Sequence, residues 1–250
     1  MNKDSLVFLD YHGKSRLTSK GSNSPCEEWP DDWFRINFKG YPRFGRTALP
    51  PPNFVGTLPG HELILSRRSE RMFAKNEALT LEELSRVLST LRITSGLEDV
   101  TYDSKRAYSS AGARYPIEAY ILPLKVTELQ SSLYHYNVRS HSLEKLWPFS
   151  QADINACFPD EGWCSESAVA VVLTACHSRT AMKYGERAYR YCLIEAGQIA
   201  QNMQLLCSSE GLACCNFGGF HDDTVMRLLD VDPSEEIVVH TLFFGKSVKV

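Results

Sequence analysis

The fold class is decided by the stretch AVAVVLTACHSRTAMKYGERAYRYCLIEAGQIAQNMQLLCSSEG, residues 168–211. Its beginning, AVAVVLTAC, is continuously apolar and rich in β-branched side chains, which predicts a central strand buried on both faces. From about Glu186 to Glu210, apolar and small side chains recur three or four positions apart, and Gly211 can adopt the left-handed conformation that ends a helix. The stretch therefore predicts a central strand followed by a long helix. The predicted inner face of that helix carries Tyr189, Leu193, Ala196, Ala200, Met203 and Cys207.

Shorter patterns on either side extend the same fold. Thr80 and Glu83 form a capping box ahead of an apolar face, which predicts an amphipathic helix over 80–91. Because strands and helices are interspersed without a regular strand–helix–strand alternation, we expect an α+β fold with a mostly antiparallel sheet flanked by helices. The other predicted elements are strands over 117–124 and 236–244, a hairpin of 133–138 with 142–146 that turns near Arg139 and Ser140, and a short helix over 222–229.

The N-terminal region differs in composition from the rest of the chain. Residues 1–60 are rich in Pro, Gly, Trp and Tyr, with three consecutive prolines at 50–52, and show little periodicity. We therefore expect residues 1–60 to form an arm that lies on a surface or a partner and contributes no core, and residues 61–250 to form the main domain.

Composition and charge exclude several classes of protein. A formal net charge of −3 gives no positive field for polyphosphate, so we expect neither nucleic acid nor an anionic membrane surface as a partner. The chain start lacks the apolar run of a signal peptide, and no later stretch reaches the roughly 18 apolar residues of a spanning helix. We expect a cytoplasmic protein.

The eight cysteines do not form a recognisable metal or disulfide pattern. None forms a CxxC motif, and no His-x₃-His pair completes a ligand set, so we expect reduced, mostly buried thiols and no metal site. Ligation of a soft metal by Cys207, Cys214 and Cys215 stays open as an alternative.

The first candidate site is the run RRSER, residues 67–71. Arg67, Arg68, Ser69 and Arg71 place three guanidinium groups and a hydroxyl within about one turn, near the predicted start of a helix. Arginine presents a rigid fork of donors that matches phosphate, and the N–H groups at a helix start favour an anion. A phosphate monoester fits this pattern, and a solvated basic turn is the alternative.

The second candidate site is the small-residue loop YSSAGARYP, residues 108–116. Small residues such as Gly112 let the backbone approach a flat ligand, while Ser109, Ser110 and Arg114 can donate to its oxygens. A plain turn before a strand explains the same residues.

The third candidate site is MKYGERAYRY, residues 182–191, between the buried strand and the long helix. Loops at the end of a central strand commonly hold reactive groups, and Lys183 beside Tyr184 can exchange a proton if burial and neighbouring arginines lower the two pKa values. A polar first turn of the helix, with ordinary charges, is the alternative.

The fourth candidate site is NFGGF, residues 216–220, shortly after the long helix. Gly218 and Gly219 allow a sharp bend or a main chain laid against a ring, and the flanking aromatics could cover that ring. A glycine-rich connection is the alternative. The sequence carries no Walker loop, strand-preceded GxGxxG, GxSxG elbow or HExxH, which excludes the common nucleotide, hydrolase and zinc classes.

Taken in order, these segments resemble the nitroreductase-like oxidases of the SagB or McbC type, which act in thiazole/oxazole-modified peptide pathways. The resemblance runs from about Tyr11 to Lys246. It is carried by YHGKSRLT near the start, RRSERMF, YSSAGARYPIEAY, LYHYNVRSHSLEKL, KYGERAYRYCLIEAGQIAQNMQLL, GLACCNFGGF and a terminal strand ending in FFGK.

The resemblance implies a nitroreductase-like, domain-intertwined homodimer with FMN at the interface, so that both active sites are shared. It implies that Arg67, Ser69 and Arg71 hold the phosphate and ribityl end, with Arg68 close by. Ser109, Ser110 and Gly112 are then expected to approach the ring or its chain. Gly218 and Gly219 are expected near the isoalloxazine, and Lys246 is expected to return to the phosphate.

The Lys-Tyr pair that peptide-azole members use for catalysis matches Lys183 and Tyr184, which are therefore the expected proton-transfer residues. Turning a thiazoline or oxazoline into an azole removes a hydride, which FMN can accept, and a proton, which a protein base must take. Dioxygen would reoxidise the reduced flavin. A lysine base needs a lowered pKa, and Arg187 and Arg190 are expected to contribute to that effect.

The sequence departs from the resemblance at two positions and leaves other functions open. Gln198 stands where many relatives have His, and Asn137 stands where Asp is usual. No fused cyclase or protease segment is recognised, which suggests a free-standing subunit acting on a peptide or related heterocycle prepared by cyclase partner enzymes. One alternative is an NAD(P)H-dependent nitro- or quinone reductase of the same fold. A non-catalytic scaffold that docks its arm on a cyclase is another.

Overall fold

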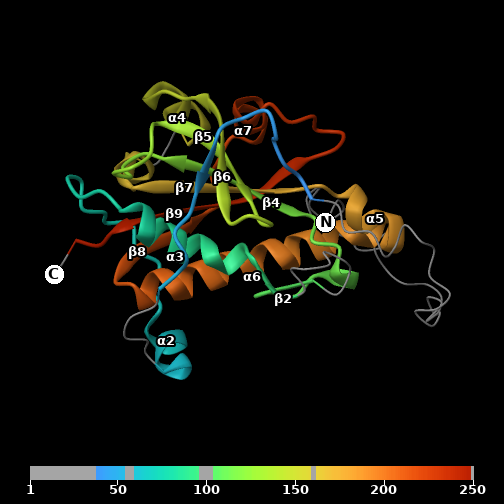
Figure 1. The fold of residues 1–250 in the computed structure, drawn as a ribbon, viewed down its shortest axis with the longest axis horizontal. Coiled ribbons are helices and arrows are strands. Elements are labelled where there is room, and N and C mark those ends of the chain that lie inside the picture. Colours follow the sequence, from blue (N-terminus) through green and yellow to red (C-terminus); the bar gives the residue numbers. More distant parts are fainter. Residues whose placement is uncertain (1–37, 54–58, 96–103, 159–161, 249–250) are drawn as a thin grey trace, which may run out of the picture.

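The architecture is a mixed α+β arrangement built on one antiparallel sheet (Figure 1). The computed structural model describes residues 38–53, 59–95, 104–158 and 162–248. Within these ranges seven strands follow the order β1-β6-β5-β4-β7-β9-β8. The strands are β1 (Arg46–Ala48), β4 (Ile117–Pro123), β5 (Ser132–Asn137), β6 (Ser142–Pro148), β7 (Val169–Ala175), β8 (Leu212–Phe217) and β9 (Ile237–Lys246).

Strand β7 lies inside the sheet, between β4 and β9. It pairs antiparallel with β4 from Ile117 opposite Ala175 to Pro123 opposite Val169. Every residue of β7 is buried, as its continuously apolar sequence predicts for a strand covered on both faces. The predicted central strand, the hairpin of β5 with β6 and the antiparallel α+β class are confirmed.

One face of the sheet is covered by α3 (Leu81–Leu88) and α6 (Ala188–Ser209), which lie together below the sheet in Figure 1. The capping box that predicts α3 is present, with the Glu83 N–H donating to Thr80 Oγ1 over 3.2 Å. Side chains from both helices pack into one cluster with the underside of the sheet, and Arg86 of α3 pairs with Glu210 at 2.6 Å.

The inner face of α6 agrees in part with the predicted one, since Ala196, Ala200, Met203 and Cys207 are buried. Leu193 is 40% exposed and Tyr189 only half-buried, because the helix turns a neighbouring stripe of side chains toward the core. The predicted end is correct, since Gly211 has φ +67°. The buried stripe consists of Ala188, Cys192, Glu195, Ala196, Ile199, Ala200, Met203, Gln204 and Cys207.

The opposite face of the sheet is covered by α4 (Gln151–Cys157) and α7 (Asp222–Leu229) (Figure 1). Helix α7 lies where the sequence predicts it. Helix α4 was not predicted, although the Ser150 side chain accepts from the Asp153 N–H over 3.3 Å in a capping box.

The described part of the N-terminal region is packed on the sheet. Strand β1 pairs antiparallel with β6 and forms one edge of the sheet. Leu49 is only 6% exposed and belongs to the core cluster below the sheet, which corrects the expectation that residues 1–60 contribute no core. The rest of that expectation, for 1–37 and 54–58, concerns residues outside the described ranges.

A group of charged side chains, all largely buried except the 46% exposed Arg46, links this segment to the sheet. His135 lies between two carboxylates, with Nε2 3.0 Å from Glu118 Oε2 and Nδ1 3.1 Å from Glu144 Oε2. Arg179 pairs with Glu118 at 2.6 Å, and Arg46 pairs with Glu144 at 2.7 Å. These five side chains connect the edge strand to the helix α5 (Ser178–Tyr184) through the interior, and we call them the charge ladder.

The charge ladder holds its two carboxyl groups in the ionised form. Burial would raise the pKa of Glu118, but the charge of Arg179 and the hydrogen bond from His135 lower it to about 2. Burial likewise opposes ionisation of Glu144, whose pKa falls to about 2 through hydrogen bonds that include His135 and Asn137. Asn137 Nδ2 donates to Glu144 Oε1 over 3.0 Å, so an aspartate at 137 would bring a second carboxylate against Glu144.

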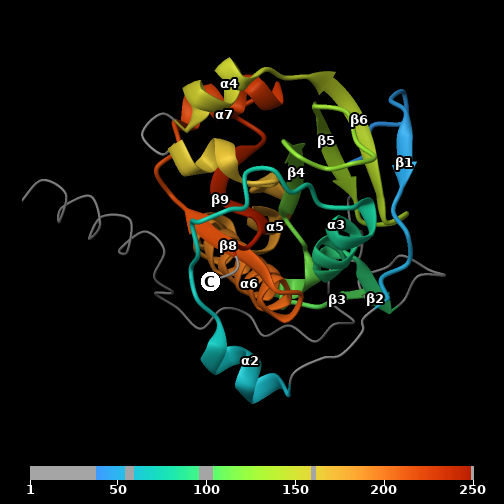
Figure 2. The ribbon, with the colours of Figure 1, turned by 90° about the vertical axis from the view of Figure 1, so that its left-hand side faces the viewer.

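Helix α2 (Gly60–Ser66) projects away from the sheet beyond α6, as the two perpendicular views agree (Figures 1 and 2). None of its residues is buried, and Ile64 and Leu65 are 61% and 74% exposed. Among the described residues, no helix is both long enough and apolar enough to cross a bilayer. The remaining elements are the ribbon of β2 (Ile93–Ser95) with β3 (Lys105–Arg106) and short 3₁₀ turns at Ser89–Leu91, Ala111–Ala113, Gly162–Glu166 and Gly185–Arg187.

Candidate functional site

The loop between β3 and β4 has an unusual backbone. Gly112, Ala113 and Tyr115 have φ values of +59°, +53° and +47°. A left-handed conformation costs a residue with a Cβ atom roughly 1–2 kcal/mol, so the surrounding contacts must hold this loop in place. The Tyr115 N–H donates to Ser110 Oγ over 2.8 Å, and the Ser109 N–H donates to Gln198 Oε1 of α6 over 2.9 Å.

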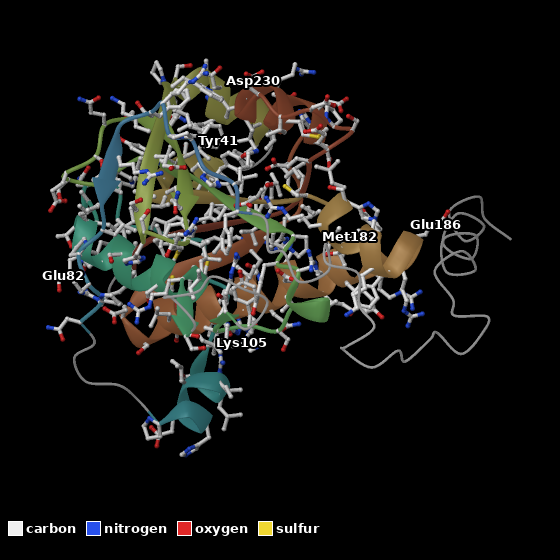
Figure 3. The ribbon with its side chains drawn as sticks, turned by 45° about the vertical axis from the view of Figure 1, so that its right-hand side comes forward. Tyr41, Glu82, Lys105, Met182, Glu186 and Asp230 are labelled. Atoms are coloured by element: carbon white, nitrogen blue, oxygen red, sulfur yellow. The ribbon has the colours of Figure 1, made fainter. Side chains whose placement is uncertain are left out.

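Lys183 and Tyr184 are the last two residues of α5. The prediction that they lie in a loop was wrong, because SRTAMKY contains good helix formers and the chain leaves the helix only at Gly185, where φ is +54°. Figure 3 shows α5, marked by Met182, standing out at one end of the molecule.

The structure brings the loop and the pair together at Gly112. A Cβ atom built on Gly112 would lie 2.8 Å from Tyr184 Oη, 3.3 Å from Lys183 Cδ and 3.4 Å from Lys183 Nζ. Glycine is therefore required both by the backbone conformation and by the closeness of these two side chains. Two sequence segments about 70 positions apart, counted between Gly112 and Lys183, meet here.

The electrostatic surroundings of Tyr184 favour its protonated form. Burial raises the pKa of the phenol, Tyr191 raises it further, and Arg114 opposes the shift. Arg114 is only 1% exposed and donates to the Arg179 carbonyl oxygen over 3.2 Å and to Met182 Sδ over 3.4 Å. These donors of Arg114 are thus directed toward α5, and donation by Arg114 to a ligand stays a prediction.

A cavity of about 750 Å³ opens beside this loop, between β3 and α6. Ser109 and Gln198 line this cavity, and Gly197 lines it without contributing a side chain. A volume of this size suits a cofactor or a small ligand. The other lining residues are Lys105, Arg106, Ala107, Tyr108, Ile194, Gln201 and Asn202.

The run RRSER, residues 67–71, is called the arginine motif below. It begins where α2 ends, which corrects its predicted place at a helix start. Arg67 is the residue that caps the C-terminus of α2, and its ψ of 128° takes the chain out of the helix. Arg67 Nη1 donates to Ser69 Oγ over 3.2 Å, so this guanidinium and hydroxyl lie side by side on an exposed surface. Arg68 instead donates to the Leu65 carbonyl oxygen at 2.9 Å, and the Arg71 guanidinium lies 5.3 Å from the centroid of the Trp163 ring.

Lys246 lies near this motif, at the end of β9. The Glu70 N–H donates to the Cys214 carbonyl oxygen and the Ala74 N–H donates to the Lys246 carbonyl oxygen, each over 2.9 Å, so residues 70–74 run along this side of the sheet. The Lys246 ammonium group forms an ion pair with Glu83 of the α3 capping box.

Gly218 and Gly219 form a third, separate group. They follow β8, a strand that was not predicted, so the chain does not pass directly from α6 into the glycines. A Cβ atom on Gly219 would lie 2.7 Å from the Phe217 ring, and the His221 N–H donates to the Cys157 carbonyl oxygen of α4 over 2.9 Å.

Within one chain the arginine motif and the Lys-Tyr pair belong to opposite ends of α6. Lys183 and Tyr184 precede this helix, whereas residues 70–74 lie beside β8 and β9 after its C-terminal end. A helix of 22 residues is about 33 Å long. The candidate residues therefore form separate groups in a single copy of the chain.

Sequence reasoning missed Glu195 as a residue of this region. It lies on the buried stripe of α6 among Cys192, Ala196 and Ile199, and it is only 2% exposed. A glutamate on the apolar stripe of a helix was the available signal, but the predicted inner face was chosen from apolar and small residues and left it out. No group of three or more His, Cys, Asp or Glu side chains in the described ranges is arranged to hold a metal ion.

Comparison with known proteins adds a family to this geometry. The chain matches the Nitroreductase family over residues 64–246, which is most of its length. The chain belongs to the nitroreductase family. The match includes the arginine motif, the loop at Gly112, the Lys-Tyr pair, the two glycines and Lys246.

Two sequence relatives of this nitroreductase-family chain differ in kind. A protein of Methanocaldococcus jannaschii, provisionally described as a nitroreductase, is 28% identical over 171 residues, covering 68% of this chain and 83% of that protein. The microcin B17-processing protein McbC of Escherichia coli is 26% identical over 147 residues, covering 56% of this chain and 54% of that protein. The chain thus aligns with about half the length of the peptide-processing relative.

Solved structures share the nitroreductase fold. One chain of the Escherichia coli microcin synthetase McbBCD complex, solved with a truncated precursor of microcin B17 bound, superposes with a TM-score of 0.65 at 20% identity, covering 100% of this chain and 95% of that one. A protein of Exiguobacterium sibiricum, provisionally described as a nitroreductase and solved in complex with FMN, superposes with a TM-score of 0.54 at 13% identity, covering 78% of this chain and 92% of that one.

Proposed function

We propose that this protein is an FMN-dependent oxidoreductase that oxidises thiazoline or oxazoline rings on a peptide, or on a related natural-product intermediate, to thiazole or oxazole. The proposal rests chiefly on the contact of Lys183 and Tyr184 with Gly112. The same loop contributes Ser109 to the wall of an open cavity of about 750 Å³, which none of these three residues lines. The likeness to McbC, a microcin-processing protein, supports the choice of a peptide substrate.

The donor chemistry of the chain fits FMN. Arg67 and Ser69 place a guanidinium and a hydroxyl side by side on the surface, as a phosphate monoester requires, and Arg71 would extend this group. Ser109, Ser110 and Gly112 would approach the ring system from the loop, and Gly218 and Gly219 would complete its surroundings. Arg68 and Lys246 would supply further positive charge near the phosphate. When bound, FMN supplies a hydride acceptor.

The chain itself would supply the proton chemistry. Aromatisation removes one hydride and one proton from adjacent ring atoms, so a protein base must take the proton. Lys183 Nζ is the proposed base. Tyr184, whose pKa is raised by burial, keeps its proton near neutral pH and can therefore donate a hydrogen bond to the substrate ring. Reduced cofactor would be reoxidised by dioxygen.

The separation of the residue groups supports a homodimer. In one copy the arginine motif and the Lys-Tyr pair belong to opposite ends of an α6 that is 22 residues long. A two-fold axis can bring one end of α6 next to the opposite end of the partner copy, so each FMN site would be shared. Exposed apolar side chains on α2 and α6 offer an interface for this arrangement. They are Ile64, Leu65, Leu193 and Ile194.

The decisive experiment combines a spectrum with a defined substrate. We expect the purified protein to absorb at about 450 nm, as oxidised flavins do. With a thiazoline-bearing peptide it should form the thiazole and consume dioxygen without NAD(P)H. Lys183→Ala should abolish this reaction while keeping the flavin spectrum. Lys75→Ala, at a surface lysine paired with Glu166, is the matched control and should keep full activity.

A nitro- or quinone reductase is the second candidate, favoured by the Methanocaldococcus jannaschii relative. It would show itself by rapid bleaching of the flavin with NADPH and turnover of a nitroaromatic, with no reaction on azolines. A colourless protein that still co-purifies with a cyclase partner would instead indicate a scaffold.

A further inference from the structure

Helix α5 and the loop before β4 are joined by two arginine side chains, one from each segment. Arg179 of α5 donates from Nη1 to the Tyr115 carbonyl oxygen over 3.2 Å. Arg114 of the loop donates from Nε to the Arg179 carbonyl oxygen over 3.2 Å and from Nη2 to Met182 Sδ over 3.4 Å. Each segment thus binds a main-chain oxygen of the other, so the contact is reciprocal.

Tyr115 is held at both of its main-chain polar groups. Its N–H donates to Ser110 Oγ over 2.8 Å, and its carbonyl oxygen accepts from Arg179. Its φ of +47° lies in the left-handed region, which disfavours a residue with a Cβ atom. Such a conformation persists only where the surrounding contacts impose it, and one of these contacts comes from α5.

Arg179 is itself fixed in the interior. Its Nη1 atom lies 2.6 Å from Glu118 Oε1, and the two side chains are only 10% and 6% exposed. His135 Nε2 lies 3.0 Å from the other carboxylate oxygen of Glu118, so Arg179 is the point at which the charge ladder reaches α5. A guanidinium group paired in this way has little freedom to move, and it therefore fixes the first turn of α5 relative to β4.

The position of α5 depends on such polar contacts because its apolar packing is sparse. Of its seven described residues, Thr180 alone is buried. A helix of this length is unstable without tertiary contacts. Lys183 lies four residues after Arg179, one turn further along the same face. A contact that fixes the first turn of α5 therefore also places the turn that carries the Lys-Tyr pair.

We propose that Arg179 is a positioning residue. By fixing α5 to Glu118 and to the loop, it keeps the Lys-Tyr pair in contact with Gly112. The effect on catalysis rests on the proposed function, whereas the effect on α5 and on the loop does not.

Amide hydrogen exchange of the purified protein tests the proposal without substrate. The double variant Arg179→Met, Glu118→Gln removes both charges of the ion pair, so it leaves no unpaired carboxylate from this pair in the interior and should fold. Exchange of the amides of 113–115 and 179–185 should accelerate about tenfold, which corresponds to about 1.4 kcal/mol for the lost contacts.

The ion pair of Arg86 with Glu210 supplies the matched control. It has the same separation of 2.6 Å and is also largely buried, with side chains 15% and 14% exposed, but it joins α3 to the end of α6. The double variant Arg86→Met, Glu210→Gln should therefore accelerate exchange in α3 and leave 113–115 and 179–185 unchanged.

Arg179→Lys tests the same point with the charge of the pair retained. An ammonium group can still pair with Glu118, but it lacks the planar fork with which a guanidinium group serves several acceptors in fixed directions. Exchange of 113–115 should therefore accelerate, though by less than in the double variant. Because the buried charges stay balanced, the comparison of Arg179→Lys with the wild-type protein decides even if the double variant does not fold.

The positioning role and the proposed function fail in different ways. Unchanged exchange of 113–115 in Arg179→Lys, or acceleration that is equal in all core strands, would overturn the positioning role. Absence of azoline oxidation by the wild-type protein, with the exchange effects intact, would overturn the proposed function alone. If both are correct, Arg179→Met, Glu118→Gln should lose about tenfold in kcat with little change in KM, and the control at Arg86 and Glu210 should keep the wild-type kcat.

Discussion

Two structural constraints of the candidate site fall on a single residue, Gly112. Its φ of +59° and its closeness to Tyr184 Oη and Lys183 Nζ are separate constraints, one on the backbone and one on space. The small-residue pattern of 108–116 allowed a close approach of the backbone, with a plain turn as the alternative. It could not reveal what approaches, because Lys183 lies far along the chain and on an element predicted as a loop.

Substitution of Gly112 by alanine should therefore impair activity more than stability. Gly211→Ala is the matched control, since Gly211 has φ +67° but no atom within 4 Å of its added Cβ. Both variants should lose about 1–2 kcal/mol of unfolding free energy through the left-handed conformation. Only Gly112→Ala, which displaces Tyr184, should lower kcat/KM for azoline oxidation by roughly tenfold or more. Equal activities of the two variants would contradict a role for this contact.

Glu195 should also leave a signature in the pH dependence of stability. Its folded-state pKa of about 7 lies above its ordinary value of 4.5, so folding binds a proton in that interval. The stabilisation is complete below pH 4.5 and is lost as pH rises through about 7. The unfolding free energy of the wild-type protein minus that of Glu195→Gln should therefore fall between these values by an amount on the order of 2 kcal/mol. Urea titrations at pH 4.5, 6 and 8 would measure it, and a pH-independent difference would contradict it.

At the scale of elements, the long helix could be predicted from its apolar periodicity and the central strand from its continuously apolar run, because burial imposes both patterns. The error in α6 arose where its stripe includes polar Glu195 and Gln204, which apolar patterning ignores. Strand β8 was missed because LACCNF is short and directly follows a helix end. Strand β1 was missed because it is three residues long and is held largely by contacts that no local pattern encodes.

Because of the charge ladder, the attachment of β1 to the sheet should weaken at acidic pH. The pKa of Glu144 is lowered to about 2 from its ordinary value of 4.5, so its stabilisation is present above pH 4.5 and lost as pH falls through 2. Glu144→Gln should reduce the unfolding free energy at pH 7 by roughly 3 kcal/mol, because it breaks a buried charge network. The difference from the wild-type protein should shrink toward pH 2.

Glu166→Gln is the appropriate comparison for Glu144→Gln. Glu166 pairs with Lys75 at 2.6 Å, but the lysine side chain is 70% exposed, so the loss should stay below about 1 kcal/mol. Thermal or urea unfolding measures both variants. Similar losses of unfolding free energy in Glu144→Gln and Glu166→Gln would mean that burial does not increase the contribution of the charge ladder to stability.

At the scale of the whole molecule, the order of the motifs was sufficient for the family, and the residue pattern was sufficient for the α+β class. The spatial arrangement of the candidate site residues could not be predicted from the sequence. Residue patterns do not encode which ends of α6 the motifs occupy. The proposal of a second copy arises from the structure, where the arginine motif and the Lys-Tyr pair belong to opposite ends of that helix.

The proposed homodimer predicts a specific sensitivity on α2. Leu65→Glu places a charge at a side chain that is 74% exposed in one copy, and it should convert the dimer to monomer and release FMN. Sedimentation velocity and the flavin absorbance would report the two effects. Ala152→Glu adds the same charge on exposed α4, over the opposite face of the sheet, and should change neither. A Leu65→Glu variant that stays dimeric and yellow would exclude α2 from the interface.

The two edges of the sheet have a consequence for handling the protein at high concentration. Edge strands with free N–H and C=O groups invite strand-to-strand aggregation. Here β1 offers three residues and begins with a charged Arg46, while on the other edge β8 is partly covered by the Glu70 N–H bonded to the Cys214 carbonyl. Neither edge presents a long template, so loss of material in concentrated solution should come from exposed apolar helices and respond to Leu65→Glu rather than to changes in the sheet.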